Sequence, residues 1–384
     1  MARRTTTGKP AFEPVVIGEP SLGAALVASL EAAAPVDRGT HGFHTYPAGL
    51  HPDAAQGILV ALPGDSVLDP FCGGGTVLVE ALLAGRRAVG RDVSPVALRV
   101  AGARTSVLPA EVVSRFRAQG RAITELAKES KDLPSPTILG SVEGWYSEHV
   151  LRELEGLRRG IAATEGPVRP LLEAVFSSIL VKTSWRKSDT SAQREKHDRP
   201  SETTAILFHK KVRDLGRKLD ALREAVPAQT PAADVRAADA RNVRVEPVDL
   251  VLTSPPYPST YDYVPLQHLR LIWLGEGHAL DAGGLDEIGA RRYWRAGARM
   301  ARKRWVEDTR LWTRSASANL RPGGSLVILI GDGLSPAGTV DTSEATEEAG
   351  KQAGLALVAR ASVERMDHAR ERARWEHAFA FRKG

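Results

Sequence analysis

Two short segments of the chain hold residues that could bind a ligand or act on one. Gly73, Gly74 and Gly75 lie where a predicted strand turns into a predicted helix, and glycine there lets a ligand press against bare backbone. Asp92 ends the next predicted strand, where a carboxylate can accept hydrogen bonds from both hydroxyls of a ribose. A tight turn without a ligand is the alternative. The pair predicts a site for a nucleoside-containing cofactor, although the loop lacks the third spaced glycine of dinucleotide sites.

The second segment is Thr253-Ser254-Pro255-Pro256-Tyr257, which follows the predicted strand Asp249–Leu252. Prolines donate no backbone N–H and fix φ, so the strand must end here in a stiff loop. This loop presents carbonyl oxygens, a hydroxyl and an aromatic ring at the carboxyl edge of a sheet, where ligands bind in open α/β folds. The alternative, a proline turn with Tyr257 packed in the core, is disfavoured by the glycine loop on the same sheet.

Both segments lie in a pattern of alternating strands and helices. Ser66 to Val100 parses as strand, glycine loop, helix, strand and a second helix that opens at Ser94-Pro95, and this β-α-β unit predicts a parallel sheet. Later strands are predicted at Val235–Ala237, Asp249–Thr253, Ser325–Gly331, Leu355–Ser362 and Glu376–Phe381. Long helical patterns lie between them, at Glu111–Lys131, Ser147–Ala162, Leu171–Val181 and Leu207–Ala225.

The alternation predicts one α/β sheet interrupted by a mainly helical insert. We divide the chain into an N-terminal tail or extension (1–40), an α/β domain made of 41–107 and 234–384, and the insert (108–233). Leu320 to Gly324 is interpreted as a helix end and a tight turn before a buried strand. The segment Ser184–Arg199 is interpreted as a loop.

Composition narrows the class of protein. The chain has 384 residues, of which 42% are hydrophobic and 26% charged, as in ordinary globular proteins. Its single cysteine, Cys72, cannot form an internal disulfide, and no Cys/His pair has zinc spacing, so we expect no metal. The longest strongly apolar run, Leu326–Ile330, is far too short for a membrane span. We expect a soluble, cytoplasmic protein without a membrane partner.

The glycine loop and the proline loop both resemble one family. Asp69-Pro70-Phe71-Cys72-Gly73-Gly74-Gly75-Thr76 is similar to the cofactor loop, D-P-F-x-G-x-G-T, of amino-group S-adenosylmethionine-dependent methyltransferases of nucleic acids. Thr-Ser-Pro-Pro-Tyr resembles the catalytic loop of that family, in the serine form associated with the exocyclic N4 of cytosine. The Asp or Asn form is associated more with N6 of adenine. The segment His44–Pro47 resembles the family's most N-terminal motif, which borders the methionine end.

The resemblance implies a class I, Rossmann-like methyltransferase sheet with S-adenosylmethionine as cofactor. It implies a cofactor site made of Asp69, Phe71, Gly73, Gly75, Thr76, Asp92 and Asp239. Asp239 has an alternative reading as a surface acid that caps a helix. The implied catalytic residues are Ser254, Pro255, Pro256 and Tyr257. Tyr261, Asp262 and Tyr263 shape the pocket or belong to loop and core, and the sequence does not separate these readings.

The chemistry of such a loop explains its residue types. An exocyclic amine on a base is a poor nucleophile, and hydrogen bonds to the Ser254 hydroxyl and the Pro255 carbonyl would draw it toward a tetrahedral geometry. Holding the amine in line with the sulfonium methyl gives direct displacement, largely by positioning. Tyr257 would stack on the base, which must be unpaired or flipped out of a duplex to reach the pocket.

Basic residues are concentrated in two segments. Lys182–Lys218 holds eleven basic and five acidic residues, and Arg291–Arg304 holds seven basic residues and no acid. A charge run is often only a solvated face, but on a methyltransferase of this kind it favours contacts with phosphates. The candidate nucleic-acid contacts are Lys182, Arg186, Lys187, Arg194, Arg291 and Arg292.

The leading hypothesis is a site-specific DNA methyltransferase acting on cytosine N4, with duplex DNA as partner and a cognate restriction endonuclease left open as a second. The alternatives are adenine N6 in DNA, a base in RNA, and a non-catalytic nucleic-acid binder. A nicotinamide dehydrogenase is a distant fourth. The insert departs from the family, whose members with this motif order usually carry it just before the catalytic strand.

Overall fold

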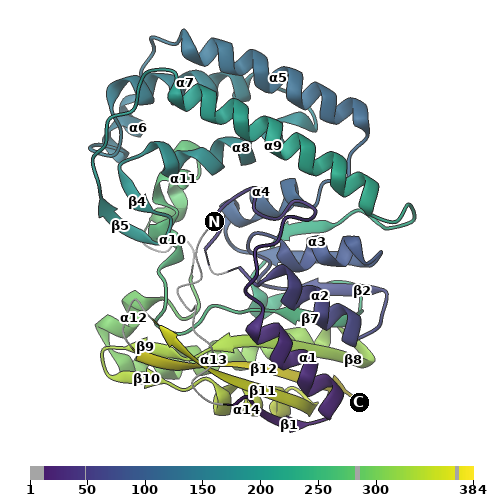
Figure 1. Cartoon of the computed structure of the whole chain (residues 1–384). Coiled ribbons are helices and arrows are strands. Elements are labelled where there is room, and N and C mark those ends of the chain that lie inside the picture. Colours follow the sequence, from purple (N-terminus) through teal and green to yellow (C-terminus); the bar gives the residue numbers. More distant parts are fainter. Residues whose placement is uncertain (1–12, 48, 282–285, 368–371) are drawn as a thin grey trace.

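The computed structural model describes residues 13–47, 49–281, 286–367 and 372–384 of the chain. Within these residues, eight strands form one sheet in the lower part of Figure 1, in the spatial order β1-β11-β12-β8-β7-β2-β3-β6. In chain order the strands are β1 (Val15–Gly18), β2 (Ser66–Asp69), β3 (Arg87–Asp92), β6 (Asp234–Ala237), β7 (Val248–Thr253), β8 (Leu320–Gly331), β11 (Leu355–Asp367) and β12 (Arg372–Lys383).

The direction of the strands defines the fold class. The five strands from β6 to β8 pair in parallel, whereas β12 is antiparallel to both its neighbours, β8 and β11. With β1 left aside and the rest numbered along the chain, the order is 3-2-1-4-5-7-6. This is a Rossmann-like methyltransferase sheet, so the predicted fold class is confirmed. The strand order reverses between β2 and β7, and ligands bind in the crevice at such a switch point.

Both faces of the sheet are covered by helices, which explains why the central strands β7 and β8 bury apolar side chains on both faces. Leu326, Ile328 and Ile330 of β8 pack in one core with two C-terminal helices, whereas Val327 and Leu329 pack on the opposite face with N-terminal helices. The N-terminal helices are α1 (Pro20–Glu31), α2 (Pro52–Ala61), α3 (Thr76–Leu83) and α4 (Pro95–Arg104). The C-terminal helices are α13 (Ala298–Ala318) and α14 (Ser343–Gln352).

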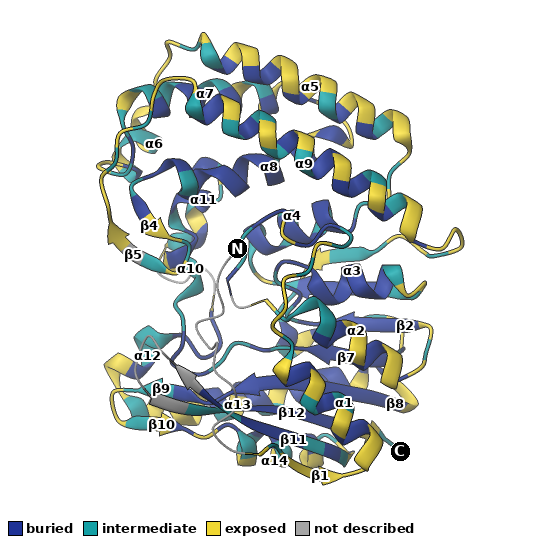
Figure 2. Ribbon diagram, viewed as in Figure 1, coloured by how far each residue is buried: buried dark blue, intermediate teal, exposed yellow. Residues whose placement is uncertain are grey.

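A second layer of helices, at the top of Figure 1, lies above α4. Its core contains Phe116, Leu154, Phe176 and Leu215. In Figure 2 the inward faces of its helices are dark blue and their outer faces yellow. This core also contains Phe43, Ala103, Leu269 and Trp273 from outside the predicted insert. The division of the chain at 108–233 therefore stays a prediction. The elements of this layer are α5 (Ala110–Lys128), α6 (Pro136–Ser141), α7 (Glu148–Ala162), α8 (Val168–Thr183), the hairpin strands β4 (Arg186–Ser188) and β5 (Ser191–Arg194), and α9 (Thr203–Ala225).

Short elements lie on both sides of the proline loop, and one of them, α11, connects the two layers. Leu269 and Trp273 of α11 join the core of the helical layer, and the Trp273 ring meets Phe176 edge to face at 6.0 Å. These elements are η1 (Ala240–Asn242), α10 (Tyr263–Leu266), α11 (His268–Trp273), η2 (Gly277–Leu280), α12 (Arg291–Ala296), β9 (Gly333–Ser335) and β10 (Gly338–Val340). No helix in the described parts of the chain is long and apolar enough to cross a membrane.

Three segments differ from the sequence expectation. The N-terminal extension is integrated from residue 15 onward, because β1 pairs antiparallel with β11 and α1 buries Leu22, Leu26 and Leu30. The expected loop after α8 contains the hairpin β4–β5. The expected turn at 320–324 lies inside β8, which has a register shift against β7 and a positive φ at Gly323. Short or bulged strands give little periodicity, so the sequence pattern does not reveal them.

Candidate active site

The glycine loop connects β2 to α3 at the switch point of the sheet. Gly73 and Gly75 have φ of 49° and 77°, a left-handed conformation that residues with a Cβ rarely adopt. A Cβ at Gly75 would also lie 3.0 Å from the backbone Cα of Ala101, in α4. The sequence therefore needs glycine at these two positions to turn the strand tightly into the helix.

Asp92 holds this loop from the next strand. Its Oδ2 accepts a hydrogen bond of 2.9 Å from the Gly73 backbone N–H, and its Oδ1 accepts one of 2.8 Å from the Ser94 N–H. Burial raises the pKa of Asp92, against the effect of these hydrogen bonds. The carboxylate stands beside the loop at the end of β3, where the sequence predicts a ribose contact.

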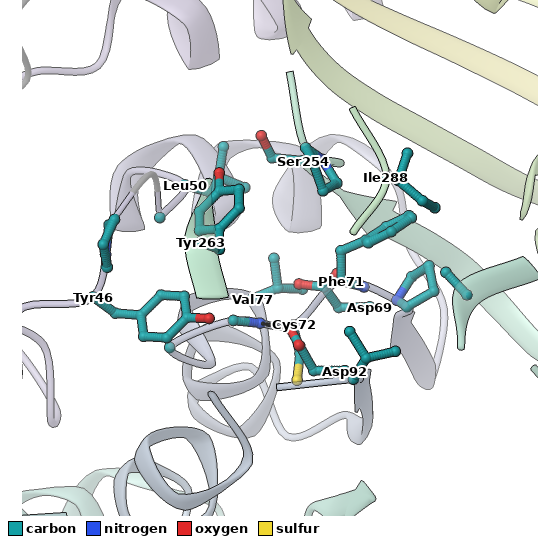
Figure 3. Close-up of a pocket in the computed structure, with 18 of the residues that line it drawn as sticks. Tyr46, Leu50, Asp69, Phe71, Cys72, Val77, Asp92, Ser254, Tyr263 and Ile288 are labelled. Carbon is teal, nitrogen blue, oxygen red and sulfur yellow. Dashed lines mark hydrogen bonds between the residues drawn. The ribbon is translucent and has the colours of Figure 1, made fainter. Parts of the chain in front are cut away.

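One cavity collects side chains from widely separated segments (Figure 3). Its walls leave about 940 Å³ of space free of protein atoms, a volume that includes the open mouth. Figure 3 shows Tyr46, Tyr263 and Ser254 bordering the same space as Asp69 and Asp92. Of the residues predicted to bind cofactor, those on this lining are Asp69, Phe71, Gly73, Thr76, Asp92 and Asp239, whereas Gly75 lies behind them as the N-cap of α3.

The charged side chains of the lining all have the same sign. Among the described residues that line the cavity, the charged side chains are all acids: Asp69, Asp92, Asp239, Asp286 and Glu287. A ligand with a pyrophosphate would be repelled by this set of carboxylates. A ligand that carries a sulfonium and an ammonium group is favoured. The acidic side chains of the lining therefore fit S-adenosylmethionine and do not fit a nicotinamide dinucleotide.

Asp239 is at the cavity but is already engaged. Its Oδ1 accepts a hydrogen bond of 2.9 Å from the Arg241 backbone N–H, and the Arg241 guanidinium contacts both carboxylate oxygens. Burial alone would raise the pKa of Asp239, but the hydrogen bonds from Arg241 outweigh it and lower the pKa. Asp239 therefore caps η1 and also faces the cavity. Its contact with the cofactor stays a prediction.

The proline loop continues β7 at the opposite wall of the cavity. Ser254 and Pro256 are on the lining, whereas Pro255 is buried behind them. The Tyr257 ring lies against Gly331 of β8, where an added Cβ would be 2.7 Å from Cε2 of the ring. The Arg374 guanidinium stands 5.9 Å from the centre of that ring. Tyr257 therefore flanks the loop on the β8 side, away from the cofactor wall.

Some residues of the lining were not singled out by the sequence. Tyr46 and Tyr263 both face the cavity, and burial raises the pKa of each phenol above its usual range. The sequence signals were the weak motif His44–Pro47 and the Tyr261-Asp262-Tyr263 run. Glu287 opens the segment Glu287–Arg292, which resembles a loop of methyltransferases that act on DNA. Asp286 had no signal, because it approaches the cavity only through the tertiary fold.

The six candidate nucleic-acid contacts are in three different situations. Lys187 and Arg194 are exposed on the β4–β5 hairpin, and Lys182 at the end of α8 is half-buried. Arg186 is buried, and its guanidinium donates 2.7 Å hydrogen bonds to the backbone carbonyls of Ser191 and Leu266. For Arg186 these contacts favour a structural role.

Arg291 and Arg292, at the start of α12, are close to acids near the cavity. The Arg291 guanidinium is 3.6 Å from the Asp262 carboxylate, and Arg292 pairs with Glu287, a lining residue. Both guanidinium groups are about one-third exposed. They are half-buried ion pairs, and through Glu287 the pair of Arg292 adjoins the cavity lining.

A separate cluster of possible metal ligands lies beside β8. Ligand atoms of Asp332, Asp341 and His377 all lie within 4.8 Å of one another. Asp332 already accepts hydrogen bonds from the Thr342 N–H and hydroxyl, and His377 bonds to Ser362 at 2.8 Å. The expectation of no metal stays a prediction.

The amino-acid sequence matches characterised proteins over this same region. Residues 59–102, which contain the glycine loop and Asp92, match the family model for N6/N4 methyltransferases, described as DNA methylase. The chain is also 25% identical over 263 residues to the type II methyltransferase M.MvaI from Kocuria varians. In this region the chain is therefore similar to the N6/N4 amino-methyltransferases. Its aligned part is 61% of this chain and spans 57% of the M.MvaI sequence.

The match to this family model, together with the Rossmann-like sheet, implies S-adenosylmethionine as the cofactor. Solved structures that resemble the chain include TrmN from Thermus thermophilus, with a TM-score of 0.35 and 16% identity over 88% of this chain and 50% of TrmN. Another is the rRNA methyltransferase AviRa from Streptomyces viridochromogenes, with a TM-score of 0.34 and 14% identity over 88% of each chain.

Proposed function

We propose that this amino-methyltransferase transfers the methyl group of S-adenosylmethionine to the exocyclic N4 amine of cytosine in DNA. One observation carries the proposal. Ser254 and Pro256 of the proline loop line the same cavity as the glycine loop and Asp92. A methyl donor held by the glycine loop and an amine held by the proline loop would then meet in one space.

In this reading the chain acts by holding and orienting the amine. The Ser254 hydroxyl and the Pro255 carbonyl accept hydrogen bonds from the two N–H groups, so the nitrogen lone pair turns toward the donor. The cofactor supplies an electrophilic methyl on a sulfonium. The amine nitrogen would take this methyl group, the electron pair of the broken S–C bond would stay on sulfur, and the amine would release one proton to solvent. Positioning supplies most of the rate enhancement.

A base can reach this cavity only when it is outside the helical stack, so the proposal includes a flipped cytosine. The Tyr257 ring, fixed between Gly331 and Arg374, is the surface on which the base would stack. The helical insert and its hairpin, with Lys187 and Arg194 exposed, are proposed to contact the phosphates. Phosphate contacts orient a nucleic acid without reading its sequence.

The runner-up reactions use the same cavity. Adenine N6 in DNA differs only in the ring beside the amine, and Ser254 in place of an acidic or amide side chain favours cytosine. A base in RNA is the third option. The dehydrogenase alternative is disfavoured because every charged side chain on the described lining is an acid, whereas a dinucleotide carries two phosphates.

The test is methyl transfer from labelled S-adenosylmethionine to unmethylated genomic DNA and, separately, to total RNA. Products are digested to nucleosides and identified by mass spectrometry. N4-methylcytosine from DNA supports the proposal, N6-methyladenine overturns the choice of base, and label only in RNA overturns the choice of DNA. A Ser254→Ala, Tyr257→Ala double variant should lose turnover and keep cofactor affinity. A non-catalytic binder would give no label with either nucleic acid.

A further inference from the structure

Three buried polar side chains behind the glycine loop have no role in the reaction described above. Arg104 ends α4, His41 precedes α2, and Glu80 lies in α3. Their exposed fractions are 5%, 3% and 2%. A buried arginine is rare unless its charge is paired and hydrogen-bonded, so the partners of Arg104 are informative.

The three side chains form a continuous chain that ends on the loop. Nη1 of Arg104 donates a short hydrogen bond of 2.5 Å to the backbone carbonyl of Gly74, and Nη2 donates one of the same length to Nδ1 of His41. On its other side, Nε2 of His41 is 2.6 Å from Oε1 of Glu80. Arg38, on the outer side, donates to the same Glu80 oxygen at 3.0 Å.

The donors and acceptors in this chain fix the protonation of His41. A guanidinium can only donate, so Nδ1 of His41 must accept. The ring is then neutral, with its proton on Nε2, where it donates to Glu80. Burial lowers the pKa of His41 to about 4, which agrees with the neutral form. Burial also lowers the pKa of Arg104 to about 10, so the guanidinium remains charged at neutral pH.

The position of Arg104 matters because the loop it contacts is conformationally free. Successive glycines have many accessible backbone conformations, so bonds from outside the loop must select one. Asp92 accepts from the N–H of Gly73 at 2.9 Å, and Arg104 donates to the C=O of Gly74. A Cβ at Gly74 would lie 3.0 Å from Nη1 of Arg104. The loop is thus held from two sides by two oppositely charged side chains.

We propose that Arg104, oriented by His41 and Glu80, is a positioning residue for the cofactor loop and sets the affinity for S-adenosylmethionine. It fixes the Gly74–Gly75 peptide in the one orientation that leaves the cavity open to the cofactor. The inference rests on the S-adenosylmethionine site and does not depend on which base is methylated.

The test is cofactor affinity in Arg104→Met, which keeps the length of the side chain and removes every donor. The Kd for S-adenosylhomocysteine is measured by calorimetry without nucleic acid. We expect it to rise about tenfold or more, the usual effect of losing a hydrogen bond to a charged group. Arg104→Lys retains one donor and should give an intermediate Kd. Under saturating S-adenosylmethionine, kcat should stay near the wild-type value while KM for the cofactor rises.

Arg38→Met is the matched control, since Arg38 also bonds Glu80 but does not contact the loop in the described structure. Its Kd should equal that of the wild type. A purely structural role would lower the melting temperature of Arg104→Met and leave the Kd of the folded protein unchanged, which overturns the proposal. An equal loss of affinity in Arg38→Met also overturns it. If Arg104→Met does not fold, Arg104→Lys decides alone, and a wild-type Kd there rejects the proposal.

Discussion

The hydroxyl of Thr253, at the carboxyl end of β7, donates a 2.7 Å hydrogen bond to Oδ1 of Asp69, at the carboxyl end of β2. The same oxygen accepts the N–H of Phe71 at 3.1 Å. One carboxylate oxygen therefore connects the start of the glycine loop to the start of the proline loop. These loops form two walls of the cavity, so this bond ties the walls together in addition to the pairing of β2 with β7.

The burial of Asp69 predicts that the free energy of unfolding falls as the pH rises. Burial raises the pKa of Asp69 to about 7, against the hydrogen bonds from Thr253 and Phe71. The folded state therefore holds a proton that the unfolded state has released between about pH 4 and pH 7, and the contribution of Asp69 to stability falls as pH rises through that window. Above it, the buried carboxylate is charged and destabilising.

We expect Asp69→Asn to remove this pH dependence, because the amide oxygen can accept both hydrogen bonds without a charge. Chemical denaturation at pH 5 and pH 8 measures the free energy of unfolding of both proteins. Relative to the wild type, the free energy of unfolding of Asp69→Asn should be higher at pH 8 than it is at pH 5. An unchanged difference across the two pH values would show that Asp69 has an ordinary pKa.

A second prediction concerns Gly331→Ala. The new methyl group would lie 2.7 Å from Cε2 of Tyr257, so the ring must move away from β8. We expect kcat to fall about tenfold or more as base stacking is weakened, with the Kd for S-adenosylhomocysteine unchanged. Gly102→Ala in α4 is the control, since its Cβ meets nothing within 4 Å and alanine favours a helix. Equal activities in the two variants would show that the Tyr257 ring is not needed.

A third prediction compares two acids of the cavity. Asp92→Ala removes the acceptor for two backbone N–H groups as well as the expected ribose contact. The Kd for the cofactor should rise about tenfold or more, and the melting temperature should fall. Asp239→Ala should have the smaller effect, because that carboxylate is shared with Arg241. Calorimetry on both variants gives the ranking, and the reverse order would contradict these roles.

The fourth prediction concerns the salt dependence of DNA binding. Lys187 and Arg194 are exposed on the hairpin, so a Lys187→Ala, Arg194→Ala variant should weaken binding uniformly across sequences. The slope of log K against log salt should become shallower by about one for each phosphate that the variant no longer neutralises. Arg115→Ala, Arg121→Ala on the exposed face of α5 removes the same charge elsewhere. Equal slopes for the two double variants would exclude the hairpin as a phosphate-binding element.

Arg186 shows why charge alone does not identify a nucleic-acid contact. It lies among the same basic residues as Lys187 and Arg194, yet it is 7% exposed and bonds two backbone carbonyls. Periodicity over three residues of a short hairpin does not say which side chain turns inward. The hydrogen bond from Arg186 to Leu266 joins positions 80 apart in the chain, and no local pattern encodes such a pair.

The local chemistry of this protein is encoded in short stretches of its sequence. The glycine loop, Asp92 and the proline loop are recognisable there because strand ends, glycine turns and prolines impose constraints within a few residues. The alternation of strands and helices in turn predicts the class of sheet. Which distant groups meet depends on the tertiary fold. Tyr46, Tyr263 and Glu287 reach the cavity, and Arg104 reaches Gly74, through packing between separate segments. Hydrophobic periodicity predicts that a residue is buried, but it does not predict which distant residues pack against it.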